Sequence, residues 1–218
     1  MPKLGPNFYT STWERIKDRL DPEHPDDTWE IAIAGIEGRF RERFEKPADA
    51  IQDLDKKDSS LYAEGRGFSI VAIDCLLLEA LHGYEQGKRT KDSKKTGKAF
   101  EKLLTSKTEF FGDVFKEGTR ARTFGSAVRN GILHDGETRD GWLVRQGKPN
   151  GQVVTAQGEW QVLNRDAFHT AVKKCLADYF ARLRSADDPK HVELRRAFKD
   201  RVDVLCKESE PPTTASTR

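Results

Sequence analysis

One stretch of the chain, from Phe68 to Leu81, restricts the fold more than any other. Apolar side chains cover nearly the whole circumference of a helix drawn through it, and its only charged residues are Asp74 and Glu79. A helix that is apolar on every side belongs at the centre of a protein. The positions one turn from Asp74 are apolar, so its carboxylate is costly unless it finds a partner. We therefore predict a central helix here.

The rest of the sequence predicts a mainly α-helical fold around this helix, because apolar residues recur at helical spacing over much of the chain. With 218 residues, 36% of them hydrophobic and 34% charged, the chain has room for one large domain with appendages. We expect an N-terminal lead-in and short helix over residues 1–25 and a helical domain over 26–206. The polar residues 207–218 are predicted to be a disordered tail.

Two segments depart from the helical pattern. Residues 1–10 read as irregular, and a capping-box pattern from Ser11 to Glu14 predicts the short helix after them, with a similar cap at Asp27 for the next helix. Short apolar runs alternate with glycine and proline turn residues over 141–163. This alternation predicts a small antiparallel β-meander inserted into the helical domain.

Composition favours a cytoplasmic protein without membrane contact. No run approaches the roughly 18 apolar residues of a membrane span, and the first residues lack the apolar core of a signal peptide. Cys75, Cys175 and Cys206 are far apart in apolar helical surroundings, so we expect reduced packing residues rather than metal ligands. The formal net charge of +2 neither favours nor excludes nucleic acid, and local charge has to decide.

A second helix, expected from about Thr119 to Gly136, carries the residues with the clearest chemistry. It has an apolar stripe on one side and polar residues on another, and it ends in a histidine. The stripe consists of Ala121, Phe124, Val128 and Ile132, and the polar positions are Arg122, Ser126, Arg129 and Asn130. Gly136 suits the left-handed position that often ends a helix.

Arg129 and His134 supply two groups that metal-free RNA cleavage needs. Histidine titrates near neutral pH and can take the proton of a 2′-hydroxyl. Arginine stays charged, and its planar fork matches two phosphate oxygens. Positions five apart on an ideal helix, however, point about 140° away from each other. The two side chains therefore meet at one phosphate only if the helix loosens at Gly131 or a second subunit completes the site.

The segment Arg129-Asn-Gly-Ile-Leu-His134 resembles the R-x4-6-H motif of HEPN domains, with a polar residue directly after the arginine. The order of a central apolar helix, a loop, an aromatic helical turn and the motif helix also resembles that family, over residues 25–185 and most closely over 66–136. HEPN proteins are all-α bundles that dimerise, and many are metal-independent ribonucleases in toxin–antitoxin and phage-defence systems. The resemblance implies an HEPN-like antiparallel helical bundle.

The resemblance also implies roles for individual residues. Arg129 and His134 would be catalytic, with Asn130 in support. Glu79 and Asp74 are candidates to hold the motif in place, as acidic residues do in some HEPN sites; an internal salt bridge or an exposed helix edge is the alternative for both. The implied activity needs no metal or cofactor, acts on RNA in a homodimer and is regulated by an antitoxin or another protein.

A non-enzymatic interpretation stays open. Lys88 to Lys98 forms a basic segment that is either a solvated loop or an arm that attracts phosphates. A dimeric module that binds RNA, nucleotides or a partner without cleavage would use cationic side chains as phosphate contacts. The predicted contacts are Arg120, Arg122, Lys94 and Lys95.

A third interpretation uses Leu133-His-Asp-Gly136, which is similar to the HD motif of metal-dependent phosphohydrolases. Those enzymes need a further upstream histidine and a downstream aspartate as metal ligands. His82 is the one plausible upstream partner. We otherwise interpret His24, His82, His169 and His191 as structural or surface residues.

Overall fold

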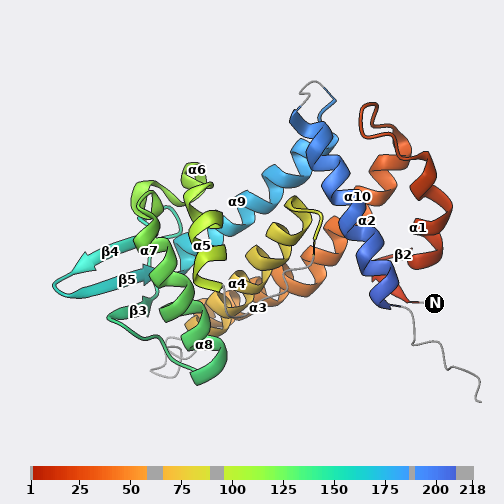
Figure 1. Cartoon of the computed structure of the whole chain (residues 1–218). Helices are drawn as coiled ribbons and strands as arrows, with labels where there is room; N and C mark the ends of the chain where they lie inside the picture. The colour runs from red at the N-terminus through yellow and green to blue at the C-terminus, as the bar shows by residue number, and fades with distance from the viewer. Residues whose placement is uncertain (1, 58–65, 89–95, 187–189, 210–218) are drawn as a thin grey trace, which may run out of the picture. The chain divides into compact units, whose positions relative to one another are not determined.

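The computed structural model describes residues 2–57, 66–88, 96–186 and 190–209. Within them the fold is mainly helical, with one two-stranded and one three-stranded sheet (Figure 1). This confirms the predicted helical character. Lys94, Lys95 and residues 210–218 of the predicted tail lie outside the described residues.

Backbone contacts group the chain into two compact units. Unit 1 comprises Met1–Glu42, Leu81–Thr90 and Tyr179–Arg218, and unit 2 comprises Arg43–Ala80 and Lys91–Asp178. Two long helices, α4 (Arg66–Glu85) and α9 (Arg165–Arg184), each contribute residues to both units.

Unit 1 surrounds a core of aromatic rings. Its elements are β1 (Lys3–Gly5), β2 (Phe8–Tyr9), α1 (Thr10–Ile16), the 3-10 turn η1 (Lys17–Arg19), α2 (Asp27–Phe40), α10 (Lys190–Ser209) and the ends of α4 and α9. Phe40 packs edge-on against Tyr84 and Phe180, and Phe198 packs against Tyr84 and Trp29. These rings come from α2, α4, α9 and α10, so the core joins segments from both ends of the chain.

The start of unit 1 differs from the sequence prediction. Residues 3–9 form a β-hairpin rather than an irregular lead-in, with Asn7 in the left-handed conformation at its turn (φ 55°). Helix α1 begins at Thr10 without a side-chain cap, so the predicted capping box at Ser11 is wrong. Helix α2 is capped one residue earlier than predicted, since Asp26 accepts from the backbone N–H groups of Thr28 and Trp29.

Unit 2 contains most of the candidate site residues. It contains the π-helical turn η2 (Arg41–Glu45) at its border, then α3 (Lys46–Lys57), most of α4, α5 (Thr96–Thr105), α6 (Thr108–Phe111), the 3-10 turn η5 (Asp113–Phe115), α7 (Gly118–Thr123), the π-helical turn η6 (Phe124–Arg129), α8 (Asn130–Asp135), the three-stranded sheet and most of α9. Phe124 is fully buried, and its ring packs against those of Phe100, Phe115, Trp142 and Phe168. The aromatic core thus joins the motif helix to α5, η5, the sheet and α9.

Helix α4 has the central place that its composition predicts. Ile70, Val71, Cys75 and Leu78 have no exposed surface. By length and composition alone this helix could span a membrane, but 56% of its 18-residue apolar window is buried inside the fold. The core helix of a folded domain passes the same test of length and composition. The burial of α4 and the enclosed charge of Asp74 fit such a core helix.

The predicted β-meander is wrong in its strand order. The strands are β3 (Trp142–Arg145), β4 (Val154–Gln157) and β5 (Trp160–Asn164), arranged β3-β5-β4. β4 and β5 form the expected antiparallel hairpin across Gly158, whereas β3 pairs with β5 in parallel, with Trp142 opposite Gln161. The connection between β3 and β4 is long enough to cross the sheet, so β4 lies on the far side of β5 from β3. The sheet is therefore mixed.

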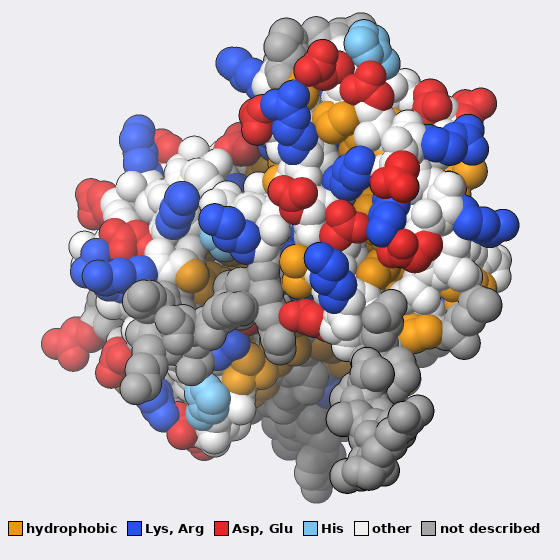
Figure 2. Space-filling view, turned by 45° about the vertical axis from the view of Figure 1, so that its right-hand side comes forward, with side chains coloured by type: hydrophobic (Ala, Val, Ile, Leu, Met, Phe, Trp, Pro, Cys, Tyr) orange, Lys and Arg blue, Asp and Glu red, His pale blue; other side chains and the backbone are white. Residues whose placement is uncertain are grey.

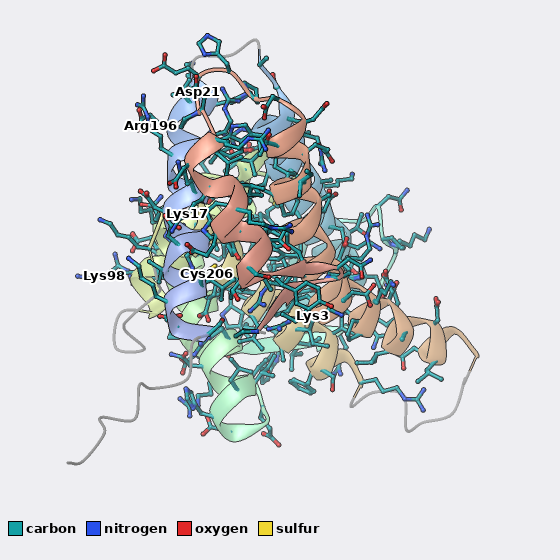
Figure 3. All side chains as sticks on the ribbon, turned by 90° about the vertical axis from the view of Figure 1, so that its right-hand side faces the viewer. Lys3, Lys17, Asp21, Lys98, Arg196 and Cys206 are labelled. Atoms are coloured by element: carbon teal, nitrogen blue, oxygen red, sulfur yellow. The ribbon has the colours of Figure 1, made fainter. Side chains whose placement is uncertain are left out.

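Charged side chains of both signs are interspersed over the face shown in Figure 2, without a large area of one sign. Several pair with each other on unit 1. Arg184 binds Glu30 and Glu37, and Arg196 binds Glu23. Asp21 and Arg196 lie toward the same end of this unit (Figure 3). Such exposed pairs contribute little to stability and chiefly keep the surface polar.

The aromatic core of unit 2 predicts the cost of removing its central ring. Phe124→Ala should lower the free energy of unfolding by about 3–5 kcal/mol, because it removes buried surface and leaves a cavity. Leu54→Ala, at a leucine that is 55% exposed in the same unit, should cost less than about 1 kcal/mol. Urea denaturation followed by circular dichroism measures both. Similar costs for the two variants would contradict this packing.

Candidate functional site

The motif helix consists of three segments without a break in the chain. A helical turn, α7, leads into the wider π-helical turn η6, which ends at Arg129, and α8 follows. Gly136 ends the helix in the left-handed conformation with φ 75°, as the sequence predicts. The N–H groups of Gly136 and Glu137 donate to the carbonyls of Ile132 and Gly131. This closing pattern satisfies the last carbonyls of the helix.

Gly131 is needed for this closure and does not loosen the helix. A Cβ atom at position 131 would lie 2.4 Å from the carbonyl oxygen of Glu137, because the chain folds back over the last turn. Asn130 to Asp135 keep α-helical geometry. The helix widens instead at η6, which ends at Arg129. The loosening considered at Gly131 is therefore found about one turn earlier.

Arg129 lies against the central helix and is held there by Glu79. Its Nε atom is 2.8 Å from Oε1 of Glu79, and its Nη2 donates to Oε2 at 2.9 Å. Its Nη1 donates to the side-chain oxygen of Asn130 at 2.9 Å. The side chains of Arg129 and Glu79 are 13% and 20% exposed, respectively. A two-point ion pair of this kind fixes the plane of the guanidinium group.

His134 occupies the exposed last turn of the motif helix. Within the described part of the chain it has no hydrogen bond or ion pair. Its neighbour Asp135 pairs with Arg139, one turn further along the chain. On a regular helix, positions 129 and 134 point about 140° apart. One protomer therefore brings Arg129, Asn130 and Glu79 together and leaves His134 on another side of the helix.

The other predicted site residues have different surroundings. Arg122 is paired at two points with Glu101, from Nε to Oε2 at 2.8 Å and from Nη2 to Oε1 at 3.0 Å. Arg120 donates from Nη1 to the backbone carbonyl of Val114 at 3.1 Å. Asp74 contacts neither Arg129 nor His134 but binds His169. In the described structure Arg120 and Arg122 contact η5 and α5, and Asp74 contacts α9.

The partner that Asp74 requires is a histidine from α9. Nδ1 of His169 is 2.8 Å from Oδ1 of Asp74, and both side chains are almost completely buried. Nε2 of the same ring is 3.0 Å from Oδ1 of Asp49 on α3. Asp49 also accepts from Nζ of Lys173, at 2.8 and 3.1 Å to its two oxygens. The four side chains connect α3, α4 and α9.

The ring of His169 has a carboxylate at each nitrogen, and this decides its protonation. Burial disfavours the charged ring, but the hydrogen bonds and charges of Asp74 and Asp49 outweigh burial and raise the pKa of His169. Burial raises the pKa of Asp74 to about 6, against the lowering effect of the His169 hydrogen bond. Burial also opposes ionisation of Asp49, yet the bonds from Lys173 and His169 lower its pKa.

This cluster was not predicted from the sequence, although the sequence contains a signal for it. Asp74 in an apolar helix demanded a partner, and His169 is the histidine that follows a buried phenylalanine, Phe168, in another apolar helix. Lys173 lies one turn after it on the same face. Interpreting His169 as structural was correct for its burial but overlooked that it lines a pocket with Lys173 and Thr170.

Metal ligation has little support in the described residues. No three His, Cys, Asp or Glu side chains come together there in a way that could hold a metal ion. Nδ1 of His82, the proposed upstream ligand of an HD-type site, lies 3.7 Å from Glu85 on its own helix. Cys75, Cys175 and Cys206 form no disulfide among the described residues and are buried, and burial raises the pKa of the Cys75 thiol well above its ordinary value. The cysteines therefore serve as core residues.

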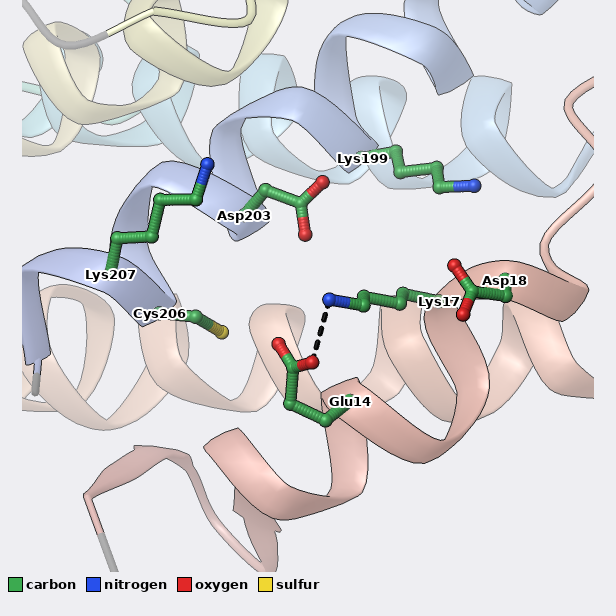
Figure 4. Close-up of a pocket in the computed structure, with 7 residues that line it drawn as sticks. All are labelled: Glu14, Lys17, Asp18, Lys199, Asp203, Cys206 and Lys207. Atoms are coloured by element: carbon green, nitrogen blue, oxygen red, sulfur yellow. Dashed lines mark ion pairs between the residues drawn. The ribbon is translucent and has the colours of Figure 1, made fainter.

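Unit 1 has a small pocket of about 220 Å³ between α1 and α10 (Figure 4). Three lysines and three carboxylates line it together with Cys206: Lys17, Lys199, Lys207, Glu14, Asp18 and Asp203. Lys17 forms an ion pair with Glu14 in this pocket, and Asp203 accepts from the indole of Trp13 at 2.6 Å. The opposite charges cancel in number, so this pocket has no electrostatic preference for an ion.

No protein-family model, curated protein or solved structure matches this chain. The resemblance to HEPN domains therefore depends on the motif and its helical setting.

The Asp74–His169–Asp49 cluster predicts a pH dependence of stability. The pKa of His169 is raised in the folded protein, so the stability it contributes is present below pH 6.5 and is lost as the pH rises through the folded-state pKa. The raised pKa of Asp74 acts in the same direction at lower pH. The free energy of unfolding should fall between pH 6.5 and 9, by at most about 1.4 kcal/mol per pH unit for one proton.

Urea denaturation at pH 6, 7.5 and 9 measures this slope, with His169→Gln as the test variant. The variant should reduce the slope, because glutamine has no proton to lose in this range. His134→Gln, at an exposed histidine, is the matched control and should keep the slope of the unsubstituted protein. Equal slopes in both variants would contradict a charged His169.

Proposed function

We propose that this chain is a metal-independent endoribonuclease of the HEPN type that acts as a homodimer. The observation that carries the proposal is the arrangement on the motif helix. Glu79 and Asn130 hold the guanidinium of Arg129 in place, and His134 is open to solvent at the end of the same helix. A fixed cation and an accessible titratable group are the two components that the reaction needs.

The contacts of Arg129 leave a phosphate-binding edge free. A guanidinium group has five N–H donors. Glu79 accepts one N–H of Nη2 and forms an ion pair with Nε, and Asn130 accepts one N–H of Nη1. One donor therefore remains on each terminal nitrogen. A phosphodiester can accept both without displacing Glu79, so Glu79 acts as a positioning residue.

The reaction follows from these groups. An imidazole of His134 takes the proton of the 2′-hydroxyl, and the 2′-oxygen attacks the adjacent phosphorus. Arg129 stabilises the negative charge that develops on the phosphate oxygens. The bond to the 5′-oxygen breaks, and an imidazolium protonates the leaving oxygen. The products are a 2′,3′-cyclic phosphate and a 5′-hydroxyl.

A dimer resolves the angle between the two side chains. Arg129 and His134 of one protomer point about 140° apart, so they do not converge on one phosphate by themselves. A two-fold axis that brings two helix ends together places the imidazole of one protomer near the guanidinium of the other. It also supplies two imidazoles, one as base and one as acid.

A non-catalytic RNA-binding module is the second candidate. It is favoured by the surroundings of His134, which has no partner in the described residues to orient its ring. In this case Arg129 binds phosphate and His134 has no role. A setting in bacterial defence or toxin–antitoxin systems, with a regulatory protein as partner, follows from the family resemblance alone.

RNA cleavage in the presence of EDTA tests the proposal. The unsubstituted protein should convert a labelled single-stranded RNA into fragments that end in a 2′,3′-cyclic phosphate. His134→Ala should reduce the rate at least a hundredfold without loss of stability, because the side chain is exposed. Arg129→Ala should reduce it similarly. It removes the ion pair between Arg129 and Glu79, so its folding is checked by circular dichroism.

Two controls match these variants in residue type. His24→Ala removes an exposed histidine of unit 1, and Arg196→Ala removes an exposed arginine of the same unit. Both should cleave at the rate of the unsubstituted protein. RNA that stays intact but is bound less tightly by Arg129→Ala, with no effect of His134→Ala, would favour the binding module. Cleavage that disappears in EDTA would count against both the mechanism and the HEPN assignment.

A further inference from the structure

A pocket of about 430 Å³ in unit 2 lies apart from the residues of the proposed nuclease site. Side chains of α9 form part of its lining, the region from η2 to α3 contributes Glu45 and Gln52, and the segment between β3 and β4 contributes Pro149. The residues from α9 are His169, Thr170, Lys173, Lys174 and Ala177. This volume falls within the range of small-molecule binding sites in proteins.

A buried, oriented histidine forms part of the pocket wall. Only 2% of the His169 side chain is exposed, and Asp74 fixes its ring through Nδ1. Nε2 of the same ring faces Asp49, so a ring protonated on both nitrogens donates to both carboxylates. The central helix thus sets the direction of this N–H donor, which belongs to a residue of the pocket wall.

The carboxylate of Asp49 occupies the place that an anion would take. It accepts from Nε2 of His169 at 3.0 Å and from Nζ of Lys173 at 2.8 and 3.1 Å. Its side chain is 41% exposed and that of Lys173 is 39% exposed, so solvent reaches this contact. Two cationic donors that converge on one accessible carboxylate form a binding arrangement for an anionic group.

A phosphate group suits this place better than a carboxylate. Lys174 also lines the pocket, is exposed and has no ion pair among the residues that the structure describes. Together with His169 and Lys173 it offers a third cation, against the carboxylates of Glu45 in the lining and of Asp74 behind the His169 ring. Thr170 and Gln52 donate to Asp166, from Oγ1 to its carbonyl and from Nε2 to its Oδ1, and their side-chain oxygens remain as acceptors that suit ligand hydroxyl groups.

We propose that this pocket binds a small, hydroxyl-bearing phosphate monoester whose phosphate displaces the carboxylate of Asp49 from His169 and Lys173. Asp49 then acts as an internal competitor that neutralises the two cations when no ligand is bound. The proposal does not depend on RNA cleavage, because none of these residues belongs to the Arg129–His134 site.

Isothermal titration calorimetry with glucose 6-phosphate, inorganic phosphate and glucose tests the proposal at pH 7. Glucose 6-phosphate should bind saturably with one site per chain, and glucose should not bind. Asp49→Asn keeps an acceptor for His169 but removes the competing charge, so it should bind the phosphate compound about tenfold more tightly. Lys173→Ala should bind it about tenfold more weakly, because a charge-assisted hydrogen bond is lost.

Lys116→Ala, at an exposed lysine of the same unit that does not line the pocket, is the matched control and should bind like the unsubstituted protein. Equal affinity for inorganic phosphate and glucose 6-phosphate would support the phosphate site and assign the free ion as its ligand. Unchanged or weaker binding in Asp49→Asn would overturn the proposal. So would a Lys173→Ala affinity equal to that of Lys116→Ala, and both variants change half-exposed side chains that the core does not need.

Discussion

The enclosure of Asp74 in an apolar helix is the constraint on which unit 2 depends. Its carboxylate has no contact with water, and His169 of α9 compensates for this burial at 2.8 Å. The same ring reaches Asp49 of α3, so one imidazole fixes three helices relative to each other. One further turn along α4, Glu79 binds Arg129. The two acidic residues of the central helix therefore position two separate cationic groups, one at a pocket and one on the motif helix.

In the candidate site, the residues that hold Arg129 in place differ from the residues proposed to act on RNA. Glu79 and Asn130 leave Arg129 with one further donor on each terminal nitrogen, while His134 remains at an exposed helix end. The regular α8 helix keeps the two side chains apart within one chain. A catalytic function consequently requires symmetry between protomers, whereas RNA binding alone would not. The proposed phosphate pocket has no such requirement, because one chain supplies all its residues.

Much of this could be predicted from the sequence where local patterns decide the structure. The apolar circumference of α4, the left-handed Gly136 and the cap at Asn164, which accepts from the N–H of Ala167, each depend on neighbours along the chain. The strand order β3-β5-β4 could not be predicted, because a meander and this mixed sheet place the same alternating residues in the same directions. The pairing of Asp74 with His169 spans 95 positions, so the sequence indicated that a partner was needed but not which one.

The charge state of His169 tests the central claim most directly. Heteronuclear NMR of the imidazole nitrogens distinguishes a ring that is protonated on both nitrogens from a neutral tautomer. The interaction with Asp74 and Asp49 predicts that His169 is doubly protonated below pH 6.5 and loses its second ring proton only above the ordinary histidine pKa of 6.5. A neutral ring at pH 7 that titrates at or below 6.5 would contradict the account, because the buried carboxylate would then lack its compensating charge.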